Sequence, residues 1–66
     1  MKVLINGAAR EVAENMTVAQ AVLTLTESPT GVAVAVNDEV VTRSAWETTP
    51  LRDSDRVEVL TAVQGG

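Results

Sequence analysis

The stretch Val32-Ala33-Val34-Ala35-Val36 is the most apolar part of the chain, with Gly31 before it and Asn37-Asp38 after it. A short apolar run between turn-forming residues is typical of a β-strand, because helices are longer. Side chains point alternately to the two faces of a strand, so the three valines share one face and the two alanines share the other. A strand that is apolar on both faces is covered on both, and we expect the chain's own helix to cover the valine face.

The alanine face of this strand, formed by Ala33 and Ala35, has two interpretations. Alanine side chains keep a sheet face flat, which suits the docking of a partner protein. The alternative is that the two alanines face small neighbouring side chains, since exposed apolar atoms are common on every protein surface. We therefore identify Ala33 and Ala35 as candidate partner-binding residues and leave the alternative open.

The residues before this run predict a β-hairpin. Lys2 to Ile5 are mostly aliphatic, and Asn6-Gly7 follows them. Asn-Gly is the strongest short hairpin signal, because a type I′ turn needs a positive φ at both central residues. We therefore expect residues 2–5 and 9–12 to form paired strands, with residues 9–12 at a partly exposed edge of a sheet.

A helix is predicted next. Thr17, followed three residues later by Gln20, has the pattern of a capping box. Behind this cap, apolar residues recur at helical spacing at Val18, Ala21, Val22 and Leu25. We expect the helix to end at Ser28-Pro29, because proline disfavours helical geometry in the residue before it.

The second half of the chain predicts a hairpin, an irregular segment and a last strand. The turn Asn37-Asp38-Glu39 leads into a short strand at Val40-Val41, and residues 56–59 alternate as the final strand. Arg43 and Trp46 are three residues apart, so one helical turn brings the guanidinium to the indole ring for a cation–π contact. Trp46 is the only aromatic residue, and we interpret it as a core residue rather than a recognition residue.

Together these elements predict an α+β protein with a mixed sheet of four to five strands and one main helix on one face. The first and last strands are able to pair in parallel at the centre of the sheet. Leu51 is expected to anchor the loop that precedes the polar turn Asp53-Ser54-Asp55. This arrangement is the β-grasp fold of ubiquitin-like proteins, in which the chain projects freely after the last strand.

The chain ends with Val63-Gln64-Gly65-Gly66, and we expect residues 63–66 to form a flexible tail after a domain at residues 1–62. Glycine loses much entropy when it is ordered, so two terminal glycines favour a thin, extended segment. Such a tail presents the α-carboxylate of Gly66, which no side chain shields. Chain ends are also often small and disordered without a function, and the two glycines alone do not decide between these alternatives.

The composition excludes several classes of function. The chain has 66 residues, no cysteine, no histidine and a net charge of -4. Without these nucleophiles, bases and metal ligands, we expect no catalytic residue, no metal site and no enzymatic activity of its own. The negative charge disfavours nucleic acids and anionic membranes as partners. The apolar run after Met1 is too short for a signal peptide or a membrane span, so we expect a cytoplasmic protein that is a monomer when free.

The chain as a whole resembles the ThiS family of sulfur carrier proteins of thiamin biosynthesis. The resemblance runs over essentially the whole length, and its motifs are specific only together and in this order. They are Asn6-Gly7, Thr17-Val18 ahead of Leu23, residues 32–37, residues 43–46, Leu51 with Asp53-Ser54-Asp55, and Val57-Glu58-Val59 running to Gly66. Two positions depart from the family pattern: Thr42 stands where proline is usual, and Ser54 stands where glycine is usual. Serine favours a type I turn without a positive φ there.

The resemblance implies a carrier rather than an enzyme. In the family, an adenylating enzyme of the ThiF type, similar to ubiquitin-activating (E1) enzymes, uses ATP and magnesium to activate the terminal glycine. Sulfur from a sulfur donor enzyme then converts that glycine to a thiocarboxylate, and a thiazole synthase of the ThiG type takes the sulfur. On this chain the reacting residue is Gly66, and the residues that thread the partner active sites are Gly65, Gln64 and Val63. The carrier binds no cofactor, and acidic residues around the Ala33/Ala35 face are expected to steer a partner.

Three alternatives remain open. The small subunit of molybdopterin synthase shares the fold, the tail and the activation chemistry but delivers sulfur to a different acceptor. Those chains are typically longer and richer in aromatic residues, so a single tryptophan favours the thiamin branch. A ubiquitin-like modifier is joined to protein lysines through an isopeptide bond, and a pure interaction module keeps an unmodified tail.

Overall fold

The structure is a computed structural model, and it describes residues 1–25 and 31–61 of the chain. Within these residues the chain forms five strands, one α-helix and one 3-10 helix, η1. In chain order they are β1 (Lys2–Ile5), β2 (Ala8–Glu11), α1 (Val18–Leu23), β3 (Val32–Val36), β4 (Glu39–Val41), η1 (Arg43–Thr48) and β5 (Arg56–Thr61). The predicted strands are therefore confirmed, with shifted bounds: the second runs from Ala8 to Glu11, the fourth begins at Glu39, and the last extends to Thr61.

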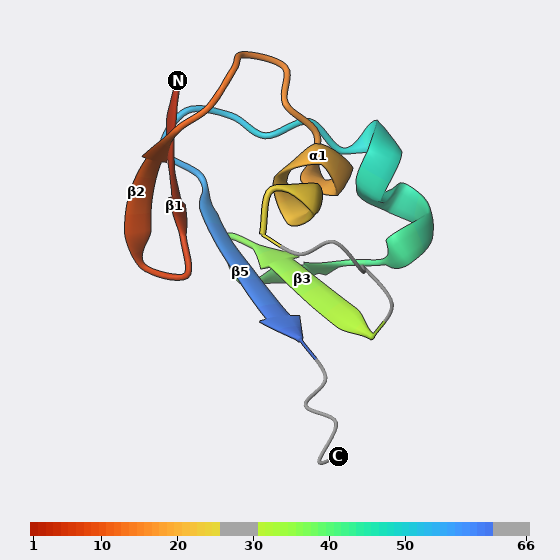
Figure 1. Ribbon diagram of the computed structural model, residues 1–66. Coiled ribbons are helices and arrows are strands. Elements are labelled where there is room, and N and C mark those ends of the chain that lie inside the picture. The colour runs from red at the N-terminus through yellow and green to blue at the C-terminus, as the bar shows by residue number, and fades with distance from the viewer. Residues whose placement is uncertain (26–30, 62–66) are drawn as a thin grey trace.

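The five strands form one mixed sheet with the order β2-β1-β5-β3-β4. β1 and β5 pair in parallel at the centre, and every other neighbouring pair is antiparallel. Figure 1 shows α1 and η1 together on one side of this sheet, where they pack against each other. The expected β-grasp arrangement is confirmed, since the first and last strands are the ones that meet in parallel.

The core lies between the sheet and the two helices. Its buried side chains are Val3, Ile5, Val18, Ala21, Val22, Val34, Trp46, Leu51, Val57 and Val59. Removing one such valine from water contributes about 1.5–3 kcal/mol. The predicted helical stripe and the predicted loop anchor are both in this cluster, with Leu25 partly buried against it.

Two-residue turns connect both hairpins. The first turn is Asn6-Gly7, with φ values of 51° and 85°, and the second is Asn37-Asp38, with φ values of 52° and 71°. A positive φ at both central residues is the type I′ geometry, whose twist matches that of the flanking strands. The first of these turns confirms the hairpin predicted from Asn-Gly, and the second makes β3 and β4 neighbours.

Helix α1 has the predicted start and an earlier end than predicted. The Thr17 N–H donates to Gln20 Oε1 at 2.9 Å, and the Gln20 N–H donates to Thr17 Oγ1 at 3.2 Å, which completes the capping box. The expected end at Ser28-Pro29 is wrong, because α1 ends at Leu23. The Thr24 hydroxyl donates to Ala21 O at 2.6 Å, and such side-chain bonds compete with the helical ladder. Residues 28 and 29 themselves lie outside the described residues.

The segment after β4 is more regular than expected, since it forms the six-residue 3-10 helix η1. Trp46 on this helix is 4% exposed, and its indole Nε1–H donates to Val41 O at 3.0 Å. Arg43 lies above the ring, with its Cζ 5.0 Å from the ring centroid. The interpretation of Trp46 as a core residue and the cation–π contact are both confirmed.

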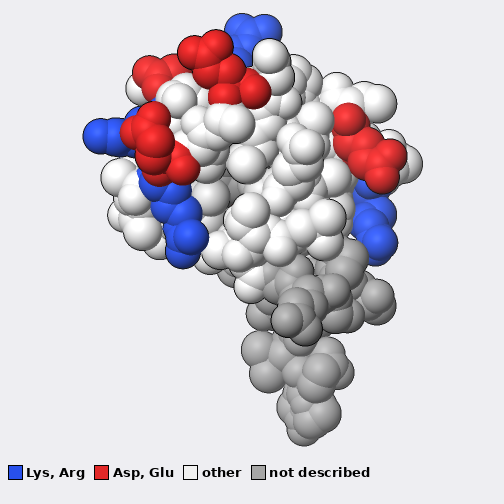
Figure 2. Space-filling view, turned by 45° about the horizontal axis from the view of Figure 1, so that its top comes forward, with Lys and Arg blue, Asp and Glu red and all other residues white. Residues whose placement is uncertain are grey.

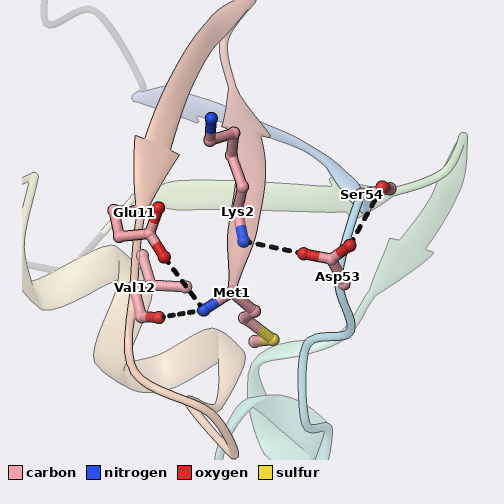
Figure 3. A network of polar contacts seen from close by, with 6 residues as sticks. All are labelled: Met1, Lys2, Glu11, Val12, Asp53 and Ser54. Atoms are coloured by element: carbon pink, nitrogen blue, oxygen red, sulfur yellow. Dashed lines mark hydrogen bonds and ion pairs between the residues drawn. The ribbon is translucent and has the colours of Figure 1, made fainter.

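The start of β1 is fastened to two other segments, as Figure 3 shows. The Met1 ammonium donates to Val12 O at 2.9 Å and lies 3.2 Å from Glu11 Oε2. On the other side, the Lys2 N–H donates to Asp53 Oδ1 at 2.8 Å. Asp53 belongs to the polar turn before β5, so this bond ties that turn to the first strand.

Ser54 in the same turn has a φ of 72°, so the expectation of a type I turn is wrong. The Asp55 N–H donates to Arg52 O at 3.1 Å, which closes a four-residue turn with Ser54 in third place. A positive φ at the third residue is the signature of a type II turn. The Ser54 N–H also donates to Lys2 O at 2.7 Å, and this tertiary bond holds serine in a conformation that it disfavours locally.

Replacing Ser54 by glycine is expected to raise the free energy of unfolding by up to about 1.5 kcal/mol. A residue with a Cβ pays about 1–2 kcal/mol for the left-handed backbone conformation, and glycine avoids this cost. Part of the gain is lost, because glycine gives up about 0.5–1 kcal/mol more conformational entropy on folding. Urea unfolding followed by Trp46 fluorescence measures the change. Ser54→Ala keeps the strained backbone and is expected to bring no gain. A Ser54→Gly protein no more stable than the wild type contradicts the prediction.

Candidate functional site

The central strand β5 leads the chain toward the predicted reactive tail. It lies between β1 and β3, and its register with β3 runs from Val36↔Val57 to Val32↔Thr61. The predicted tail residues Val63, Gln64, Gly65 and Gly66 lie outside the described residues. The described part of the site is therefore the strand that carries the tail, together with the sheet surface beside it.

The face of the sheet opposite the helices carries a group of apolar side chains, which we call the open face. It consists of Leu4, Ala33, Ala35, Val40 and Leu60. The register pairs Ala33 with Leu60 and Ala35 with Val40, so these residues adjoin one another on three neighbouring strands. Val40 is 77% exposed and Leu60 is 68% exposed. Exposed apolar groups gathered in one place mark interaction surfaces more often than scattered ones do.

The two predicted residues of this face differ in exposure. Ala33 is exposed, whereas Ala35 is partly buried. Sequence reasoning missed the larger side chains Val40 and Leu60, although a signal was present. Every second residue of a strand points to the same face, so Leu60 shares the face of Arg56 and Glu58. Val40 and Val41 are adjacent on a strand, so only one of them can face the core.

Charged side chains of both signs accompany the open face. Lys2 pairs with Glu11 across β1 and β2, and Glu58 pairs with Ala35 across β5 and β3. Arg56 lies opposite Leu4, and its guanidinium is 2.9 Å from Asp38 Oδ2 in an exposed ion pair. The expected acidic surroundings are thus mixed with basic groups. Figure 2 shows the same intermixing of acidic and basic groups on the face in view.

The helix side of the molecule has a hollow of about 320 Å³ between α1 and η1. Its lining consists of Ala19, Leu23, Arg43, Ser44, Trp46 and Glu47. In residues 1–25 and 31–61, no three His, Cys, Asp or Glu side chains gather in a way that could hold a metal ion. Over those same residues, no helix has the length and apolar character needed to cross a membrane.

Comparison with known proteins agrees with the fold. The Escherichia coli (strain K12) sulfur carrier protein ThiS is 29% identical over 66 residues, which cover both chains completely. The crystal structure of the thiamine biosynthesis protein ThiS from Geobacter metallireducens superposes with a TM-score of 0.81 at 33% identity, with full coverage of both chains. The solution structure of a thiamine biosynthesis protein from Geobacter metallireducens gives 0.82 at 33% identity, covering all of this chain and 88% of that one.

The family match includes the part of the chain that carries the predicted reactive residue. The model of the ThiS family matches residues 3–66, a range that includes most of the first strand, the open face and the two terminal glycines. The mixed sheet with its central parallel pair agrees with the ThiS structures at a TM-score above 0.8. The chain therefore belongs to the ThiS family of sulfur carrier proteins.

Proposed function

We propose that this sulfur carrier takes up sulfur on the C-terminal carboxylate of Gly66 and donates it to the formation of the thiazole ring of thiamin. The observation that carries the proposal is the family match, which extends to Gly66 itself. The position of β5 supports it, because the strand that leads to this residue lies at the centre of the sheet.

The chemistry needs an activating partner, because a carboxylate is a poor electrophile. In the proposal, an adenylating enzyme brings ATP and magnesium, and a Gly66 carboxylate oxygen attacks the α-phosphorus. The bond to the β-phosphate breaks, and pyrophosphate leaves. Sulfur at the sulfide oxidation level, supplied through a sulfur donor enzyme, then attacks the acyl carbon. AMP departs with the carboxylate oxygen, and a thiocarboxylate remains for a thiazole synthase to use.

Mass spectrometry of the intact protein tests this proposal. The carrier is incubated with ATP, magnesium, sodium sulfide and an adenylating enzyme of the ThiF type. We expect a mass gain equal to the exchange of one oxygen for sulfur, located on the C-terminal peptide and dependent on ATP. A ladder of conjugates with other proteins would support a ubiquitin-like modifier instead, and an unchanged mass would contradict sulfur uptake.

The open face is the surface on which the activating enzyme docks in this proposal. Leu60 lies on the strand that leads to the tail. Ala33 adjoins it through the sheet register, and Val40 lies one strand further along, beside Ala35. A partner that covers this face therefore lies beside the point where the chain leaves the sheet. Burial of Val40 and Leu60 supplies the apolar contact area, and the charged groups around it set orientation and approach.

Replacing Ala33 by arginine is expected to weaken binding to the activating enzyme at least about tenfold, because a buried unpaired charge costs more than 1.4 kcal/mol. Ala8→Arg is a matched control. Ala8 is also exposed on a strand, but it pairs with the buried residue Ile5 and therefore points to the helix side. Calorimetric titration of the two variants measures the dissociation constants. Equal constants for Ala33→Arg and the wild type would exclude this face.

A further inference from the structure

Both hairpin turns begin with an asparagine whose side chain accepts a hydrogen bond from the backbone of β5. Asn6 Nδ2 donates to Val59 O at 3.2 Å, and the Val59 N–H donates to Asn6 Oδ1 at 2.8 Å. At the other end of β5, the Arg56 N–H donates to Asn37 Oδ1 at 2.9 Å, and Asn37 Nδ2 donates to Asp55 Oδ1 at 3.0 Å. Asparagine side chains therefore hydrogen-bond the backbone of β5 at Arg56, its first residue, and at Val59, two residues before its end.

The Asn6 amide extends the short pairing between β1 and β5. That pairing covers Leu4↔Arg56 and Ile5↔Val57, and the Asn6 N–H donates to Val57 O at 2.9 Å. After Asn6 the backbone turns away into β2. The side-chain amide then bonds both the N–H and the C=O of Val59, as a residue of an antiparallel neighbouring strand would. Val59 is 7% exposed, so loss of these partners would leave nearly buried polar groups unsatisfied.

We propose that Asn6 is a positioning residue that fixes the direction in which β5 presents the C-terminal glycine to the activating enzyme. The inference rests on the proposed function. Val59 precedes Thr61, where β5 ends, by two residues, and Asn6 is its partner on the β1 side. Without the amide, the backbone hydrogen bonds that join β5 beyond Val57 to another strand in the described residues go to β3. The amide therefore fixes where β5 ends relative to the open face on which the partner docks. A shift of that end point changes where the tail enters the partner, and misplacement of a reacting group lowers the rate of the chemical step.

The variants Asn6→Gly and Asn37→Gly test the inference as a matched pair. Glycine keeps the positive φ of both turns, and each variant loses two hydrogen bonds at the β5 strand or beside it. We expect both to lower the urea midpoint by a similar amount. Only Asn6→Gly is expected to lower kcat for adenylation of the carrier, by about tenfold, with KM changed less than about twofold because the docking face is intact.

The adenylation readout is ATP–pyrophosphate exchange on the activating enzyme at saturating carrier. Equal kcat values for the two variants would overturn the inference, because a merely structural role predicts equal losses. A wild-type carrier that supports neither exchange nor sulfur uptake would overturn the proposed function, and the positioning role with it. An active wild type with two equally active variants would overturn only the positioning role.

Amide hydrogen exchange in the free carrier supplies a second readout that needs no partner enzyme. Asn6→Gly is expected to speed exchange of the Val59 amide at least about tenfold, because its hydrogen-bond acceptor is gone. Asn37→Gly is expected to speed exchange of the Arg56 amide instead, because that amide loses its acceptor. In this variant the Val59 amide is expected to exchange faster only to the extent that the whole protein is less stable. Unaltered Val59 protection in Asn6→Gly would contradict the proposed attachment.

Discussion

Replacing Gly66 by alanine is expected to leave the domain folded and to lower the rate of sulfur uptake by about 10²-fold. The added methyl group sits on the carbon next to the acyl carbon, where it crowds first the attack on ATP and then the attack by sulfur. Gly66 lies outside residues 1–25 and 31–61, which hold the core cluster that the structure describes, so the stability of that cluster has no reason to change. Time courses of thiocarboxylate formation by intact mass measure the rate.

Gly65→Ala separates crowding at the acyl carbon from obstruction along the tail. Its methyl group narrows passage into a partner but lies one residue from the reacting carbon, so we expect a smaller loss than for Gly66→Ala. Both variants should match the wild type in urea midpoint and in affinity for the activating enzyme. An unchanged rate of sulfur uptake in Gly66→Ala would refute the argument that an unshielded terminus is required.

Trp46→Ala is expected to lower the free energy of unfolding by about 3–5 kcal/mol, the range for truncating a buried tryptophan. The ring is 4% exposed within the core cluster, and its N–H bonds Val41 O at 3.0 Å. Total stability for 66 residues is only about 3–10 kcal/mol, so this single change is able to unfold the protein. Far-UV circular dichroism in urea is the suitable measurement, because the variant has no fluorescent tryptophan.

Two further variants keep this prediction testable if Trp46→Ala does not fold. Arg43→Ala removes the cation above the ring, a contact worth about 0.5–1 kcal/mol at an exposed site. Trp46→Phe keeps an aromatic ring but leaves Val41 O without its indole partner, with an expected loss of about 1–3 kcal/mol. A loss for Trp46→Phe no larger than for Arg43→Ala would contradict the hydrogen-bonded core role of Trp46.

The elements that could be predicted follow local rules. The capping box at Thr17 and Gln20 needs partners only three residues apart, and the Asn6-Gly7 turn needs only two residues with a positive φ. The alternation of β3 follows from the pleat of a strand. The candidate site was predictable only in part: the resemblance pointed to Gly66, and alternation pointed to Ala33. The larger exposed residues Val40 and Leu60 became apparent through the register of three strands.

The sequence by itself determined the order of the elements, the alternating faces of the valine–alanine strand at residues 32–36, and the resemblance to the ThiS family. Tertiary structure alone decided the positive φ of Ser54 and the bonding of Asn6 to Val59, 53 residues away. The physical reason is the separation along the sequence over which each interaction acts. Periodicity and turn preferences act within a few residues, whereas these features depend on hydrogen bonds and packing between segments that only folding brings together.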